Sequence, residues 1–170
     1  AGRLAKEKNR ELLIKAFSVT VTKNKKLKLI LVGDFSYRKT LEYIAASTAT
    51  ADKIIFTGQI DRNSLGDIYA TVDIFCLPSL TDTQALVLNE AAHAGLPIIW
   101  CDDQGVNTVL LDKVSGQIAP NNDRVFALVI KDLANSKQLR HQFGHQHKHL
   151  TLVCKDNSQT KKLTSWLDAP

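Results

Sequence analysis

Four short apolar runs constrain the fold of this chain more than any other feature of its sequence. Each run is rich in β-branched residues, is almost continuously apolar, and closes on Gly, Pro or Asp. Runs bounded in this way are typical of strands buried on both faces, as in a parallel sheet. The runs are LKLILVGD (27–34), DKIIFTG (52–58), VDIFCLPS (72–79) and LPIIWCDD (96–103).

Segments with helical periodicity, such as NRELLIKAF and ALVLNEAAHAG, separate these runs. Strands that alternate with helices form βαβ units, whose right-handed crossovers place helices on both faces of the sheet. Beyond the fourth run, GVNTVLLDKV predicts another helix and GQIAP a short edge strand. Asn121, Asn122 or Asp123 can cap the next helix, and Ser136 the one after it. The sequence therefore predicts an α/β fold: a doubly wound, Rossmann-like parallel sheet with a helical C-terminal tail.

One domain, 1–170, accounts for the whole chain. Its 170 residues fall in the usual range for one domain, and no Pro-, Gly- or Ser-rich linker or internal repeat divides them. Cys76, Cys101 and Cys154 occur singly, which favours a reducing compartment. No run approaches the roughly 18 apolar residues of a membrane span. We therefore expect a cytoplasmic domain, whose only membrane contact would be peripheral.

Basic residues crowd the first quarter of the chain, and the formal net charge is +5. Such a bias favours anionic partners, namely phosphates, acidic lipids or nucleic acid. For most of these side chains the alternative is a solvated helix face plus a lysine-rich turn. Nucleic acid is not expected, because only 6% of the residues are aromatic and the basic residues lack interleaved aromatic ones.

Two carboxylates, Asp82 and Glu90, lie near the end of the third run with seven residues between them. In open parallel sheets, ligands bind outside the carboxyl ends of the strands, where this loop and the following helix lie. The amino terminus of that helix offers unpaired N–H groups for phosphate, whereas acids suit hydroxyls. Sugar hydroxyls beside a diphosphate satisfy both. The alternative is that Asp82 is a turn or capping residue and Glu90 a solvated helix residue.

Five motifs follow one another along nearly the whole chain. They are a GRL near a Lys, a V/I-x-F-x-G turn, an aspartate-led strand ending in LPS, an acid-x7-acid pair, and an AGLP turn. In this order they resemble the nucleotide-sugar-binding, C-terminal half of retaining glycosyltransferases with the GT-B fold, in the large group called glycosyltransferase family 4. The resemblance implies a domain truncated from a two-domain enzyme whose acceptor-binding half precedes it.

The resemblance also assigns roles to individual residues. It gives the catalytic pair Asp82 and Glu90 the hydroxyls of the donor sugar and the ribose, respectively. The remaining assignments are Arg3, Lys8, Leu86 and Val87 for the diphosphate, Gln84 and Ala85 for the donor sugar, and Gly58, Gln59 and Ile60, with Glu90, for the nucleoside. Leu86, Val87, Gln84 and Ala85 would act through backbone N–H groups. Enzymes of this fold usually work without a divalent cation, so no metal or other cofactor is expected.

The function implied is transfer of a hexose with retention of configuration. The TDTQ stretch resembles the TETQ form of bacterial glucosyltransferases that act on diacylglycerol. UDP-glucose is therefore the preferred donor and a lipid the preferred acceptor, with a glycan as the alternative. The basic amino-terminal region suits an anionic bilayer, which favours the inner face of the cell membrane. Without its acceptor half, the isolated chain is expected to show no turnover.

Three other interpretations compete with this one. A non-catalytic, degenerate partner subunit is the main alternative, because the family commonly has Glu at the position of Asp82 and Gly at that of Ala85. NAD is discounted, since no G-x-G-x-x-G follows a strand. A stripe of histidines on a C-terminal helix suggests either zinc or a solvated helix face, and the second is preferred because no Cys or carboxylate ligand accompanies it. The stripe comprises His141, His145 and His149, with His147 beside it; His93 is expected at the surface or at an interface.

Overall fold

The computed structural model describes residues 2–21, 26–79, 86–101 and 116–156, with side chains up to residue 146. The helices are α1 (Arg10–Val21), α2 (Arg38–Ala46), α3 (Leu65–Thr71), α4 (Leu86–His93), α5 (Asp123–Asn135) and α6 (Lys137–Asp156). The strands are β1 (Leu29–Val32), β2 (Ile54–Gly58), β3 (Phe75–Leu77), β4 (Ile98–Cys101) and β5 (Gly116–Ala119). Short 3-10 helices are η1 (Lys6–Lys8), η2 (Ala51–Lys53) and η3 (Arg62–Ser64).

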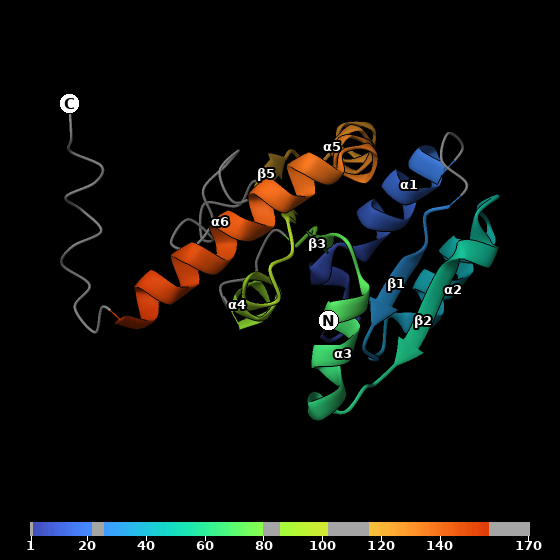
Figure 1. The fold of residues 1–170 in the computed structure, drawn as a ribbon. Coiled ribbons are helices and arrows are strands. Elements are labelled where there is room, and N and C mark those ends of the chain that lie inside the picture. The colour runs from blue at the N-terminus through green and yellow to red at the C-terminus, as the bar shows by residue number, and fades with distance from the viewer. Residues whose placement is uncertain (1, 22–25, 80–85, 102–115, 157–170) are drawn as a thin grey trace.

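Each of the four apolar runs contains one strand, and GQIAP contains β5 (Figure 1). Every strand pair is parallel: β1 with β2, β3 with β4, and β4 with β5. The predicted parallel α/β fold is therefore confirmed. The predicted helix GVNTVLLDKV lies outside the described residues.

Strand β4 has helices on both of its faces. All four of its residues are buried, none being more than 2% exposed. Ile99 and Cys101 point into a core cluster that includes residues of α1, α2 and α5, whereas Ile98 and Trp100 join a second cluster with residues of α3 and α4. Successive side chains of a strand point to opposite faces, so this division means that the sheet is wound on both sides.

The described strands differ from one continuous sheet in a single place. Hydrogen bonds join β1 to β2, β3 to β4, and β4 to β5, but none is found between β1 and β3 among the described strands. A cavity of about 360 Å³ separates these two strands. The prediction that every strand is buried on both faces is wrong for β2. Ile55 of this strand is 41% exposed, because β2 lies at the outer edge of its pair.

Two of the predicted helix caps are present. The Asn122 side chain accepts hydrogen bonds from Arg124 N (3.0 Å) and Val125 N (3.1 Å), so it, and not Asn121 or Asp123, caps α5. Ser136 Oγ accepts from Leu139 N (3.1 Å) at the start of α6. α6 forms the predicted C-terminal tail, and none of the described helices is both long and apolar enough to cross a bilayer.

Gly116 permits the close pairing of β4 and β5, and replacing it tests this contact. A Cβ there would lie 2.2 Å from Ile98 O and 2.8 Å from the Trp100 ring. We expect Gly116→Ala to lower the free energy of unfolding in urea by about 1–3 kcal/mol, because the strands must move apart. The control is Gly66→Ala on α3, which meets nothing within 4 Å and should be neutral or stabilising by up to about 1 kcal/mol. Equal effects of the two substitutions would contradict the packing argument.

Candidate functional site

The amino-terminal segment that carries Arg3 runs alongside the carboxyl end of β1 and the residues that follow it. Gly2 N donates to Val32 O and Leu4 N to Asp34 O, both at 3.1 Å. The start of the chain therefore lies beside the end of this strand (Figure 1). The exposed Arg3 guanidinium lies over the Phe35 ring, 5.2 Å from its centroid. A cation held over a ring face in this way is partly oriented before any ligand arrives.

The same segment continues to the ends of β3 and β5 and carries Lys8 with it. Lys8 is half-buried at the end of η1. The next residue, Asn9, has a left-handed backbone (φ 51°), and its Nδ2 donates to Pro78 O (3.1 Å) and to Asn121 Oδ1 (3.0 Å). Ser79 Oγ donates to the Glu7 carbonyl at 3.5 Å. The two predicted diphosphate cations are thus on one segment that is hydrogen-bonded to the ends of three strands.

Helix α4 begins at Leu86, next to the predicted sugar-binding loop. Asp82, Gln84 and Ala85 lie outside the described residues, so their predicted roles stay predictions. Leu86 is 55% exposed, which leaves the first turn of the helix accessible. The first N–H groups of a helix lack intrahelical partners and lie at the positive end of its dipole. Leu86 and Val87 therefore supply backbone N–H groups suited to an anion.

Glu90 lies one turn further along α4 and is held by a neighbouring helix. Its Oε2 accepts a hydrogen bond from the Tyr69 hydroxyl of α3 at 2.9 Å. Glu90 is half-buried and Tyr69 is buried. Burial, and then the bond to Glu90, raise the pKa of Tyr69, so its hydroxyl stays a neutral donor. Glu90 is therefore not the fully solvated helix residue of the alternative interpretation.

Gly58, predicted at the nucleoside site, ends β2 next to the end of β1. Its φ of 71° favours glycine, and its carbonyl accepts from Gly33 N at 2.9 Å. Arg38 Nη1 would lie 3.1 Å from a Cβ at this position. Gln59, which follows, is exposed, and Ile60 is half-buried. The predicted nucleoside residues thus lie at the same edge as Arg3.

The sequence did not point to four residues that contribute to this carboxyl edge of the sheet. Arg38 forms ion pairs with Asp34 (3.1 Å) and Glu42 (2.7 Å), and the i, i+4 spacing of these charges was a signal that could have found it. Phe35, Asn9 and Tyr69 act through residues distant in the sequence. No spacing rule links those partners.

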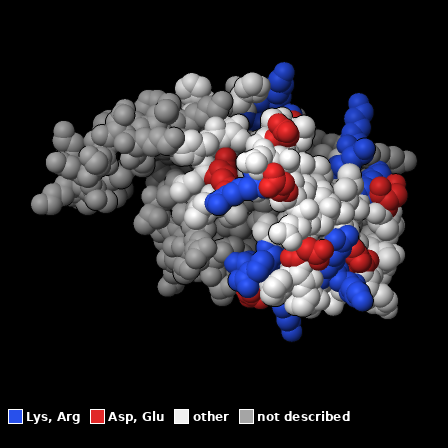
Figure 2. Space-filling view, turned by 90° about the horizontal axis from the view of Figure 1, so that it is seen from below, with Lys and Arg blue, Asp and Glu red and all other residues white. Residues whose placement is uncertain are grey.

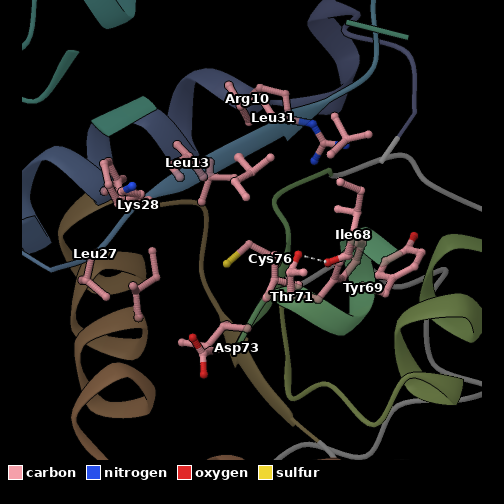
Figure 3. Close-up of a pocket in the computed structure, with 18 of the residues that line it drawn as sticks. Arg10, Leu13, Leu27, Lys28, Leu31, Ile68, Tyr69, Thr71, Asp73 and Cys76 are labelled. Carbon is pink, nitrogen blue, oxygen red and sulfur yellow. Dashed lines mark hydrogen bonds between the residues drawn. The ribbon is translucent and has the colours of Figure 1, made fainter. Parts of the chain in front are cut away.

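The cavity between β1 and β3 is a separate feature. Its wall includes Leu13, Leu31, Ile68 and Cys76, with Arg10 near one end (Figure 3). Burial raises the pKa of the Cys76 thiol to about 12, although Arg10 opposes the shift. A thiol of this kind is not an activated nucleophile. Of the predicted donor-binding residues that the structure describes, none lines this cavity.

Metal ligands and surface charge add little to the site. Within the described part of the chain, no three His, Cys, Asp or Glu residues gather to hold a metal ion. His141 and His145 are exposed on α6, and the side chains of His147 and His149 lie outside the described ones. His93 is exposed, as predicted. On the face shown in Figure 2, Lys and Arg are interspersed with Asp and Glu, so no broad patch of one sign covers its described surface.

A family model described as "Glycosyl transferases group 1" matches residues 1–150. Among individual proteins, the alpha-monoglucosyldiacylglycerol synthase of Streptococcus pneumoniae is 30% identical over 117 residues, or 69% of this chain and 26% of that protein. The chain spans only 21 to 30% of the length of the first three curated relatives that it matches.

Solved structures share the fold. The C-terminal domain of LpcC, a glycosyl transferase group 1 family protein from Francisella tularensis, matches with a TM-score of 0.82 at 22% identity, over 90% of this chain and 82% of that one. Anabaena Alr3699/HepE, solved in complex with UDP, gives a TM-score of 0.82 at 20% identity, over 97% and 47% of the two chains. These matches confirm the predicted fold class.

The two hydrogen bonds donated by the Asn9 side chain can be tested by substitution. In Asn9→Gly the left-handed conformation is tolerated and the two side-chain hydrogen bonds are lost. In Asn9→Ala the left-handed conformation adds a further cost of about 1–2 kcal/mol. We expect both variants to unfold at lower urea concentrations than the parent, with Asn9→Ala the less stable. If Asn9→Gly matched the parent in stability, the side-chain tie would be energetically unimportant.

Proposed function

Because this chain belongs to the family of group 1 glycosyl transferases, we propose that it binds a nucleotide sugar and serves as the donor half of a retaining hexosyltransferase. The hydrogen bonds from Asn9 and Ser79 carry the proposal. They hold the segment with Arg3 and Lys8 at the end of β3, from which the chain continues through Asp82 to α4 and Glu90. We infer that the two cations, the first N–H groups of α4 and the Glu90 carboxylate serve one donor at this edge of the sheet.

In the proposed mechanism the donor half stabilises charge and transfers no proton. As the bond from the sugar to the diphosphate breaks and the acceptor oxygen bonds to the sugar, negative charge grows on the leaving diphosphate, which takes up the proton that the acceptor hydroxyl loses. Arg3, Lys8 and the first N–H groups of α4 would bind that charge more strongly in the transition state than in the ground state. Asp82 would hold the hydroxyls of the sugar, and Glu90 those of the ribose. Hydrogen bonds to charged groups contribute roughly 1.5–3 kcal/mol each, so a few of them account for tight donor binding.

UDP-glucose is the donor that we propose, with a lipid or a glycan as acceptor. Three observations support it: the TDTQ stretch, the lipid-glucosylating name of the Streptococcus pneumoniae relative, and the UDP in the Anabaena structure. A lipid acceptor agrees with peripheral binding at the inner face of the cell membrane. Neither a metal ion nor another cofactor takes part in the proposed reaction.

We also propose that a preceding segment of a longer protein completes the sheet. The cavity between β1 and β3 has the backbone edge of a parallel strand on each side (Figure 3). Gly2 and Leu4 already bond in succession to the end of β1, in the direction of a parallel pair. A strand leading into Gly2 would enter this cavity, join the two sheets, and connect to the acceptor-binding half. The chain alone would then bind the donor without transferring its sugar.

Calorimetric titration with UDP, UDP-glucose and GDP tests donor binding. We expect the uridine ligands to bind, and Arg3→Ala, Lys8→Ala and Glu90→Ala each to weaken binding by about ten- to a hundredfold, because each removes a charged hydrogen-bonding group. Lys15→Ala and Asp67→Ala, at exposed positions on α1 and α3, are the matched controls and should bind as the parent does. A chain that ignores all three ligands would instead fit the degenerate partner subunit.

Hydrogen exchange tests the completing strand. Extending the chain with the preceding residues of the longer protein should slow exchange of amides in β1 and β3, since these strand edges gain partners. An extension of equal length with proline at alternate positions is the control, because proline donates no hydrogen bond. If the two extensions protected β1 and β3 equally, no strand would have formed between them. Sugar transfer by the unextended chain would contradict the need for an acceptor half.

A further inference from the structure

Tyr69 is the residue from which we draw a further inference, which rests on the proposed role of Glu90. We propose that Tyr69 is a positioning residue that fixes the Glu90 carboxylate for the two ribose hydroxyls of the donor. The two side chains come from different helices, and the Tyr69 hydroxyl donates to Glu90 Oε2 at 2.9 Å. Within the part of the chain that the structure describes, no other side chain is found hydrogen-bonded to this carboxylate.

The Tyr69 ring has little freedom to move. It is 7% exposed and lies in the core cluster formed with β3, α4 and β4. Its centroid is 6.0 Å from that of Phe75, with the ring planes tilted by 50°. Aromatic pairs at such distances and angles contribute stabilisation beyond that of the buried area, which helps to fix the ring. The packing of the ring therefore presents the hydroxyl to α4 before a ligand is bound.

This hydrogen bond gives the two oxygens of the Glu90 carboxylate different roles. An ionised carboxylate has two oxygens and about four sites for hydrogen bonds. Tyr69 occupies one site on Oε2 and leaves Oε1 for the neighbouring 2′ and 3′ hydroxyls of a ribose. An exposed Glu side chain samples several rotamers, and a ligand must restrict them on binding. Because Tyr69 restricts them beforehand, the ligand meets an oriented acceptor.

The chemistry of Tyr69 fits this role and no catalytic one. Burial and the bond to Glu90 keep its phenol protonated. The neutral hydroxyl donates to the carboxylate and does not compete with the diphosphate of the donor for cations. Phenylalanine has the same ring without the hydroxyl. Tyr69→Phe therefore removes the bond while retaining most of the packing in the core cluster.

The test is calorimetric titration of the full chain with UDP and with 2′,3′-dideoxyuridine diphosphate, which lacks both ribose hydroxyls. The proteins are the parent, Tyr69→Phe, Glu90→Ala and the double variant. We expect Tyr69→Phe to weaken UDP binding by about three- to tenfold and to change the affinity for the dideoxy ligand by less than about twofold. In the Glu90→Ala background, adding Tyr69→Phe should cause no further loss. Tyr43→Phe, at a position 78% exposed, is the matched control and should change neither affinity.

Each other outcome overturns a distinct part of the inference. Equal weakening of both ligands by Tyr69→Phe would show that Tyr69 acts through the scaffold and not through the ribose. Weaker UDP binding in Glu90→Ala but unchanged binding in Tyr69→Phe would overturn the positioning role and leave the role of Glu90 standing. Unchanged UDP binding in Glu90→Ala, or no binding by the parent, would overturn the ribose assignment and the positioning role with it.

Discussion

Burial of β4 on both faces is the constraint on which the rest of the structure depends. Ile99 and Cys101 are covered from one side and Ile98 and Trp100 from the other, so helices must pack on both faces at once. Burying large apolar side chains contributes roughly 1.5–3 kcal/mol each, which makes this strand a principal source of cohesion. Since α4 leads into β4, the same burial constrains where α4 ends and how the helix lies against the sheet.

At the carboxyl edge of the sheet, polar contacts rather than apolar packing hold the chain segments together. The carboxyl ends of parallel strands leave carbonyl groups without ladder partners, and here the amino-terminal segment supplies several of the missing donors. Leu4 N bonds to Asp34 O, and Asn9 Nδ2 to Pro78 O. The bonds that satisfy these strand ends also set the position of the predicted diphosphate cations. Stability and the proposed ligand binding therefore depend on the same short segment, in which a left-handed Asn9 is tolerated because its side-chain amide donates hydrogen bonds to two loops.

The sequence predicted the parts that depend on local pattern. The strands, their parallel order and the cap at Asn122 follow from apolar periodicity and side-chain chemistry, which act over a few residues. It did not predict the bond from Tyr69 to Glu90, because that contact depends on how two helices pack, and neither spacing nor composition encodes helix packing. It also overestimated the burial of β2, since an apolar run does not reveal whether its strand lies in the middle or at the edge of a sheet. The loop with Asp82 lies outside the described residues, and its role rests on resemblance.

The cavity and the site are connected through α3. Ile68 and Tyr69 are adjacent on this helix, and both line the cavity between β1 and β3. Tyr69 also reaches Glu90, so whatever fills the cavity restrains the helix that holds the carboxylate. A strand placed there would join the half of the sheet that carries Gly58 to the half that leads into α4. The proposed nucleoside and ribose contacts come from these two halves, so their separation would be set by the completed sheet. The proposed connection to an acceptor-binding half would therefore also determine the geometry of the donor site.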